Sequence, residues 1–185
     1  LLTIGMLLKK AMRGEIDLLS PAIEVGKSLM AIPSFETPDY SALFSEEKVV
    51  LGNLKKAFLM ISGKAVETFG MDLEKHQQLI LAAAEVMIEV YMAESALLKA
   101  EKVAMMKSEA EAEGQIAMAK LNLYNAVNKV GQMGKEAISY FADGDEQRMM
   151  MMGLKRFTRY TNMPNAIALR KTIAKIVIEN NKYCF

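Results

Sequence analysis

The chain has 185 residues and is 52% hydrophobic and 24% charged, with 23 basic and 22 acidic side chains and a formal net charge of +1. A charge so close to neutral gives no electrostatic basis for nucleic-acid binding, which requires clustered lysine and arginine. A single Cys and a single His exclude an internal disulfide and a Cys/His zinc site. We therefore expect a soluble globular protein of about one domain that buries roughly 70% of its unfolded surface.

The chain opens on a short apolar segment. Residues 1–8 are largely apolar, and Lys9 and Lys10 come directly after them. A membrane span needs about 20 apolar residues, and a signal peptide carries its positive charge before the apolar run. The pattern instead predicts an amphipathic helix that ends at Gly14. Because the chain does not start with Met, we expect it to be a piece of a longer protein, and we expect a cytoplasmic one.

Proline placement predicts where the long helices lie. The four prolines bracket a proline-free interior, as long helices require: Pro21, Pro33, Pro38 and Pro164. Ser20 and Pro21 predict the N-cap and first position of a second helix, which ends near Ala31. Residues 32–44 contain two of the prolines and several aromatic side chains, and they are predicted to form an unusually apolar loop.

Two further helices are predicted next. The first begins with Ser45 as N-cap, has Glu46 and Glu47 at the positive end of its dipole, and ends at Gly70. Its apolar stripe steps by three or four residues through Leu51, Leu54, Phe58, Ile61 and Ala65. Asp72 is predicted to cap the next helix, of about 35 residues. That helix has an apolar face with Ile80, Ala83, Met87, Val90 and Leu97, and a polar face with Gln78, Glu85, Glu89, Lys99 and Lys102.

The clearest helical pattern covers residues 109–142. Apolar positions alternate steps of three and four residues at Ile116, Ala119, Leu123, Ala126, Val130, Met133, Ala137 and Tyr140. Such spacing is typical of coiled-coil-like packing in a bundle. A short helix over 146–159, a turn over 161–165 and a last helix over 166–180 complete the chain. No segment alternates as a strand does, so we predict an all-α antiparallel bundle of about six or seven helices, two of them long.

The titratable residues predict little site chemistry. A di-iron bundle needs two Glu-x-x-His motifs, whereas this chain has one histidine, His76, and Leu73 stands where the Glu would be. We therefore predict no metal ligand, and we interpret His76 as a surface or half-buried residue near a helix start rather than a general base or haem ligand. Glu94 lies on an apolar stripe. It is either an acid/base group or, as we favour, the partner of a Lys or Arg on a neighbouring helix.

Three other features have both a functional and a structural interpretation, and for each we favour the structural interpretation. The run over residues 149–152 consists of four methionines, a residue type that suits adaptable grooves. Consecutive helical residues point in different directions, so core packing plus a subunit or domain contact is expected. Cys184 has no neighbour that would lower its pKa, so we interpret it as inert. Gly131 and Gly134 lie inside the predicted helix and suggest close helix packing rather than a phosphate loop.

Several stretches resemble one known family, the acyl-CoA dehydrogenases. The opening LLTIGMLLKKAMRGEIDLL resembles the segment after the flavin-contacting Glu-Gly-Thr-Asn-Glu-Ile motif near the end of that family's catalytic region. The appended C-terminal domain of long members, namely the very-long-chain type and its bacterial relatives, is similar to AAAEVMIEVYMAESALLKAEK (residues 82–102), DEQRMMMMGLKRFTRY and NKYCF. The resemblance covers essentially the whole chain.

The resemblance implies a domain without chemistry of its own. The parent enzyme oxidises an acyl-CoA to the trans-2-enoyl-CoA in fatty acid β-oxidation, with FAD as hydride acceptor and a Glu as base, and is typically a homodimer. Both the flavin motif and the catalytic Glu would lie upstream. Residues 1–20 would then end the catalytic region and residues 21–185 would form the appended bundle. We expect no catalytic or cofactor-binding residue in this chain. Acyl-CoA would be contacted only through the parent enzyme. The expected partners are the catalytic domain and a second subunit.

Membrane contact is not expected. In the very-long-chain enzyme the segment before the extra bundle is long, basic and linked to membrane association. The corresponding residues 32–47 are short, carry acidic side chains (Glu36, Asp39, Glu46, Glu47) and include no Lys or Arg, so an anionic leaflet would repel them. Two alternatives stay open from the sequence: a free-standing scaffold that binds a partner helix, and a membrane-surface adaptor that acts through residues 32–44.

Overall fold

The computed structural model describes residues 2–30, 39–182 and 184–185, and helices make up all regular structure in those ranges. In chain order these are α1 (Leu2–Met12), α2 (Leu19–Met30), α3 (Ser45–Phe69), the 3-10 helix η1 (Gly70–Lys75), α4 (Gln77–Met106), α5 (Glu113–Phe141), α6 (Gly144–Phe157) and α7 (Ala166–Asn180). The predicted all-α bundle is confirmed. Three α-helices rather than two are long, because α3, α4 and α5 have 25, 30 and 29 residues.

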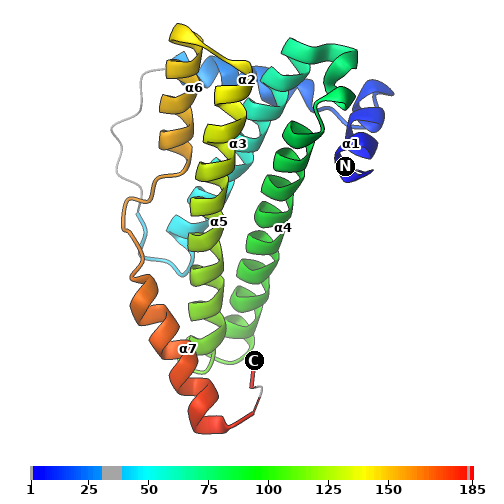
Figure 1. Ribbon diagram of the computed structural model, residues 1–185. Coiled ribbons are helices and arrows are strands. Elements are labelled where there is room, and N and C mark those ends of the chain that lie inside the picture. The colour runs from blue at the N-terminus through cyan, green and yellow to red at the C-terminus, as the bar shows by residue number, and fades with distance from the viewer. Residues whose placement is uncertain (1, 31–38, 183) are drawn as a thin grey trace.

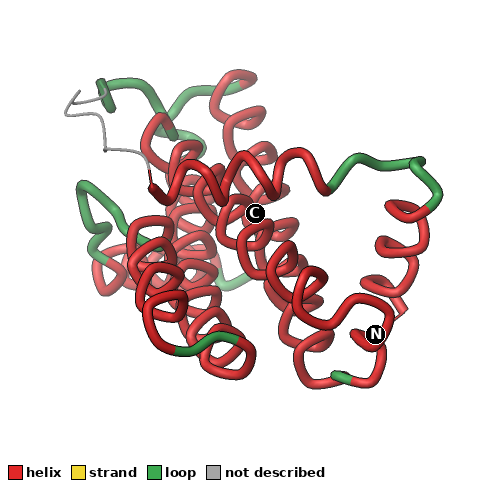
Figure 2. The backbone as a smooth tube through the Cα atoms, turned by 90° about the horizontal axis from the view of Figure 1, so that it is seen from above, coloured by secondary structure: helices red, strands yellow, loops and turns green. Residues whose placement is uncertain are grey.

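Helices α3 to α6 lie side by side and alternate in direction, while α2 crosses one end of the bundle (Figure 1). Short connections after α4 and α5 enforce the antiparallel arrangement. α1 lies to one side and reaches α2 through a loop, as the view from above shows (Figure 2). α7 packs along α5 and extends past the other helices at the lower end (Figure 1).

The predicted stripes form the core. On α5 the side chains of Ala119, Leu123, Ala126, Val130 and Ala137 are buried, and Ile116 and Met133 pack partly buried against the core. The stripe fails only at its last position, because Tyr140 is 58% exposed. On α3 four of the five predicted stripe residues are buried and Phe58 is half-buried. The spacing of the apolar residues along the sequence therefore located the core faces of both helices.

Several predicted helix starts are displaced by a few residues. α2 begins at Leu19, and the carboxylate of Asp17, not Ser20, accepts a hydrogen bond from the first turn, at Ser20 N (3.0 Å). This hydrogen bond lowers the pKa of Asp17. Ser45 is the first residue of α3 and not its N-cap, because Phe44 occupies that position in the left-handed region at φ 60°.

The start of α4 is displaced further. Residues 70–75 form η1, so Asp72 lies in that helix and His76 directly precedes α4. Gly70 does end α3, at φ 49°, as predicted. α5 begins at Glu113 rather than near residue 109, because Ser108 forms a turn in which its Oγ accepts from Glu111 N (3.2 Å).

The described end of the predicted 32–44 loop packs on the bundle. Residues 32–38 lie outside the described part of the chain, but Phe44 is only 1% exposed and Leu43 packs partly buried against the core. The ammonium of Lys120 lies 5.9 Å from the centre of the Phe44 ring and pairs with Glu47 at 3.2 Å. The apolar side chains at this end of the loop are therefore core residues.

A buried carboxylate ties two distant parts of the described chain together. Glu46 Oε1 accepts from the backbone N–H groups of Thr161 (2.6 Å) and Asn162 (2.8 Å), and its Oε2 accepts from Asn162 Nδ2 (2.9 Å). The sequence predicts that Glu46 serves only the dipole of its own helix. In the structure it also fixes the α6–α7 connection, which sets the position of α7.

Tyr160 lies next to this connection, and its buried hydroxyl has no hydrogen-bond partner among the described residues. A buried hydroxyl without a partner costs about 1–3 kcal/mol. We expect Tyr160→Phe to raise the free energy of unfolding by about 1 kcal/mol, measured by urea denaturation. A loss of stability would contradict the assignment of this hydroxyl as unpartnered.

The same residue predicts an alkaline pH dependence. Burial, followed by the negative charges of Glu47 and Glu46, raises the pKa of Tyr160 above its usual value. Because the unfolded chain releases this proton at about pH 10 and the folded chain does so only at higher pH, stability is retained below about pH 10 and declines above it. Tyr160→Phe should flatten this decline in melting curves between about pH 9 and 11. Parallel curves for both proteins would refute the prediction.

Candidate functional site

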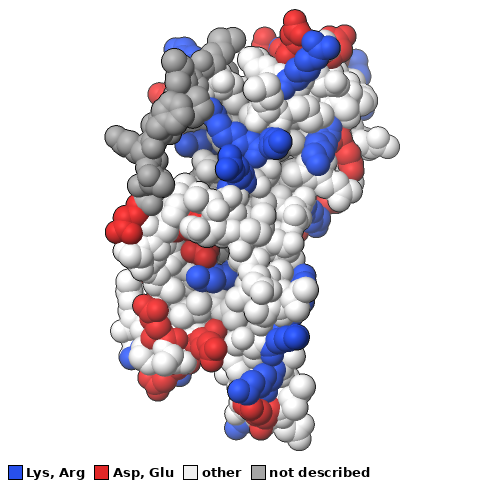
Figure 3. All heavy atoms as spheres, turned by 90° about the vertical axis from the view of Figure 1, so that its left-hand side faces the viewer, with Lys and Arg blue, Asp and Glu red and all other residues white. Residues whose placement is uncertain are grey.

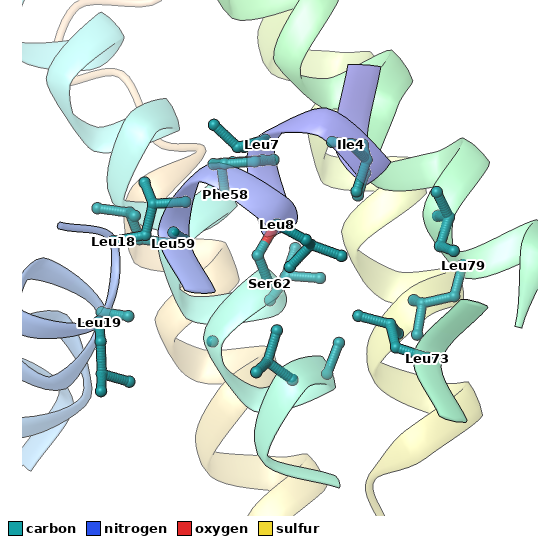
Figure 4. Close-up of a pocket in the computed structure, with 18 residues that line it drawn as sticks. Ile4, Leu7, Leu8, Leu18, Leu19, Phe58, Leu59, Ser62, Leu73 and Leu79 are labelled. Carbon is teal, nitrogen blue, oxygen red and sulfur yellow. The ribbon is translucent and has the colours of Figure 1, made fainter. Parts of the chain in front are cut away.

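An apolar cavity lies between the α1–α2 segment and the bundle (Figure 4). It has a volume of about 240 Å³, and its wall is formed by α1, α2, α3, η1 and the first turns of α4. Its wall includes Leu7 and Leu8 of α1 and Phe58 and Leu59 of α3, and Leu79 of α4 lines another side (Figure 4). An engineered cavity of about 150 Å³ with similar lining takes up benzene, so this one has room for a small apolar group.

One polar atom stands out in the cavity wall. Ser62 lines the cavity, and its buried Oγ has no hydrogen-bond partner among the described residues. A water needs about two to four polar partners to be held in such a space, and the rest of the lining is overwhelmingly hydrocarbon. The cavity can therefore hold apolar groups, but its described lining brings no acid, base or nucleophile pair together.

His76 lies in a second, more polar hollow at the start of α4. This hollow has a volume of about 380 Å³, and Lys75, Gln78 and Glu136 also line it. The imidazole Nδ1 lies 2.7 Å from the hydroxyl of Tyr140, and the ring stacks on Phe69 with centroids 3.9 Å apart. His76 is half-buried at a helix start, as predicted, and its partner is the exposed last residue of the α5 stripe.

Glu94 is paired, as the favoured interpretation predicts. Its carboxylate lies 2.6 Å from the ammonium of Lys55 on α3, and its side chain is 37% exposed, so it lies at the edge of the core. A similar pair joins α4 to α5, where the Lys129 ammonium donates a hydrogen bond to Glu89 (2.8 Å), and this bond raises the pKa of Lys129. These carboxylates hold helices together.

The methionine run and the cysteine also have structural positions. Met150 is buried, Met152 is exposed and the other two are half-buried, so the run does not form one groove. Cys184 is half-buried, with its Sγ 4.0 Å from the carbonyl of Ile176. Gly134 is buried where α5 meets α3 and α6, as close helix packing requires. The same prediction is wrong for Gly131, which is half-buried and has only Thr158 nearby, at 3.8 Å or more from a Cβ placed there.

Within the described ranges, no three His, Cys, Asp or Glu side chains come close enough to form a metal site. No helix of the described chain has the length and apolar character needed to cross a membrane. Acidic and basic side chains both occur on the face shown in Figure 3, with large uncharged areas between them. No single-sign field therefore suggests a polyanionic partner on the described part of that face.

Comparison with known proteins gives consistent results. The family described as "Acyl-CoA dehydrogenase, C-terminal domain" matches residues 53–156. A probable acyl-CoA dehydrogenase of Bacillus subtilis is 29% identical over 176 residues, which cover 95% of this chain and 29% of the relative.

A crystal structure of an acyl-CoA dehydrogenase complexed with FAD, from Bacillus anthracis, superposes with a TM-score of 0.90 at 29% identity. The match covers 98% of this chain and 30% of that one. The chain thus spans about a third of the length of the relatives it matches. The family match covers more than half of its residues, all of them within helices α3 to α6 and their connections. The chain belongs to the acyl-CoA dehydrogenase C-terminal domain family.

Proposed function

We propose that this chain is an auxiliary C-terminal bundle of an FAD-dependent acyl-CoA dehydrogenase of the long, very-long-chain-like bacterial type. The longer enzyme would oxidise an acyl-CoA to the trans-2-enoyl-CoA. The observation that carries the proposal is the match over 98% of this chain to only 30% of an FAD-complexed acyl-CoA dehydrogenase. Residues 1–20 would end the catalytic region and residues 21–185 would form the appended bundle.

The role proposed for the bundle is structural. It would pack on the catalytic region, support a homodimer and cover the acyl-chain end of the active site. FAD, when bound, supplies the hydride acceptor. The apolar cavity does not fit it, because Ser62 is the only hydroxyl in its described wall and that wall has no cation for the diphosphate. We therefore assign the flavin and the acyl-CoA contacts to the part of the enzyme that precedes this chain.

The proposal predicts different behaviour for the full-length protein and for residues 1–185 alone. The full-length protein should purify with the yellow absorbance of bound flavin and reduce an electron acceptor when given an acyl-CoA. Residues 1–185, mixed with FAD and acyl-CoA, should show neither property. A yellow, active 185-residue chain would refute the structural role, and a colourless full-length protein would refute the parent activity.

The membrane alternative loses support from the described end of its segment. Phe44, the last aromatic side chain of the 32–44 loop, is buried in the bundle and unavailable for insertion into lipid. Co-sedimentation with anionic liposomes at low salt would test whether the rest of the 32–44 segment binds a membrane. We expect the full-length protein to stay in the supernatant.

A further inference from the structure

Helix α4 carries a second apolar stripe that faces away from the bundle. We call it the α4 outer stripe, and its members are Leu81, Ile88, Tyr91, Met92, Leu98 and Met105, all of them exposed. Seven residues are nearly two helical turns, so Leu81 and Ile88 share one line along the helix and Tyr91, Leu98 and Met105 share an adjacent one. The opposite side of α4 is buried against α3 and α5. A helix that is apolar on both sides is normally covered on both sides.

The stripe has the composition of a protein interface. Tyrosine and methionine are enriched at such interfaces, whereas charged residues are depleted from their centres. Two exposed lysines interrupt the stripe, because Lys99 lies about five helical turns after Leu81 on the same line and Lys102 lies between the two lines. The other nearby charge, Glu89, is paired with Lys129. α4 is about 45 Å long at about 1.5 Å per residue, so the stripe could extend along most of the bundle. Contiguous exposed apolar patches are typical of sites of association.

The path of the chain indicates what covers the stripe. α1 lies against the first half of α4, where Ile4 and Leu8 share the apolar cavity with Leu79 and Ile80 (Figure 1). Leu81, the first member of the stripe, comes directly after Ile80. Any polypeptide that precedes α1 therefore starts near the first turns of α4, at the end of the stripe that holds Leu81. The relatives are about three times as long as this chain. A tethered segment has an effective concentration in the millimolar range, which favours it over a second, free copy.

We infer that the α4 outer stripe is the docking surface for the catalytic part of the longer protein, the segment that precedes residue 1. This inference rests on the proposed function and adds to it the face through which the bundle attaches. The stripe would be buried in the full-length protein at any concentration. Exposed apolar side chains on other helices, such as Ile167 and Ile178 of α7, would not be.

The native methionines allow a test without any substitution. Met105 in the stripe and Met163 in the α6–α7 connection are similarly exposed here, at 78% and 68%. α4 and the α6–α7 connection lie on opposite sides of the bundle (Figure 1). Methionine oxidation by peroxide depends on exposure. In the full-length protein we expect Met105 and Met92 to oxidise at least about ten-fold more slowly than Met163, as read by peptide mass spectrometry. Equal rates would overturn the inference.

Two further measurements identify which polypeptide covers the α4 outer stripe. If protection of Met105 disappears on dilution over about two orders of magnitude in the micromolar range, a second copy covers the stripe and the inference is wrong. Leu98→Asp should expose Met105 to oxidation, whereas the matched change Ile167→Asp on α7 should not. Flavin absorbance and acyl-CoA turnover are read on the same wild-type sample, so protection without activity would overturn the proposed function alone. Activity without protection would overturn this docking surface alone.

Discussion

Glu46→Ala should lower the free energy of unfolding by about 3 kcal/mol, because hydrogen bonds to a charged group contribute about 1.5–3 kcal/mol and this carboxylate accepts three of them. The donors are the backbone N–H groups of Thr161 and Asn162 together with Asn162 Nδ2. Urea denaturation measures the loss. The amides of Thr161 and Asn162 should also lose their protection from hydrogen exchange.

Glu46→Gln is the matched control. The amide oxygen of the introduced glutamine can still accept from both backbone N–H groups, and Asn162 can rotate its own amide to meet the new NH₂ group. We expect this variant to retain most of the stability, with a loss of about 1 kcal/mol. If both variants lost the same stability, the negative charge rather than the hydrogen-bond geometry would be the stabilising feature.

Gly134→Ala should lower the free energy of unfolding although alanine favours helices. A Cβ at this position would lie 2.7 and 2.8 Å from the two methyl groups of Leu154 and 3.2 Å from Ile61 Cδ1. Leu154 is itself fully buried and has little room to move. Overpacking at such a site costs up to about 3 kcal/mol, against a gain of about 1 kcal/mol in helix propensity. We expect a net loss of about 2 kcal/mol, measured by chemical denaturation.

Gly131→Ala on the same helix should have the opposite sign. A Cβ there meets only Thr158, at 3.8 Å or more, which is an ordinary contact. The helix-propensity gain of about 0.5–1 kcal/mol should therefore appear in full. Combining Gly134→Ala with Leu154→Ala should cost less than the sum of the two single changes, because the shorter side chain makes room for the new methyl group. Strict additivity would contradict the steric explanation.

The repetitive part of the fold could be predicted from sequence, and its boundaries could not. The 3-4 spacing located most of the buried faces of α3 and α5, because a helix in a bundle buries one face whose residues recur every three or four positions. Helix starts depend on competition between neighbouring caps. Asp17 rather than Ser20 caps α2, and Phe44 takes a left-handed conformation just before Ser45. The local sequence suits more than one starting residue at each helix, and only tertiary contacts decide between them.

The polar contacts between distant segments were the least predictable. The pairing of Glu94 with a cation was predicted because a carboxylate beside an apolar stripe needs a partner, but its partner, Lys55, was not. Glu46 was predicted only as a dipole partner, since nothing local indicates that it binds residues 161 and 162. The cavity beside Ser62 leaves no sequence signal, because its lining consists of ordinary core residues.

The antiparallel bundle and the Glu46 contact together have a consequence for the order of folding. The α4–α5 and α5–α6 pairs join neighbours in sequence, so the entropy lost in closing their loops is small and they can form early. The hydrogen bond from Thr161 to Glu46 spans 115 positions. It should therefore form late, and its loss should accelerate unfolding while leaving the rate of folding nearly unchanged. Stopped-flow chevron plots would then show that Glu46 determines how long the folded bundle persists rather than how fast it forms.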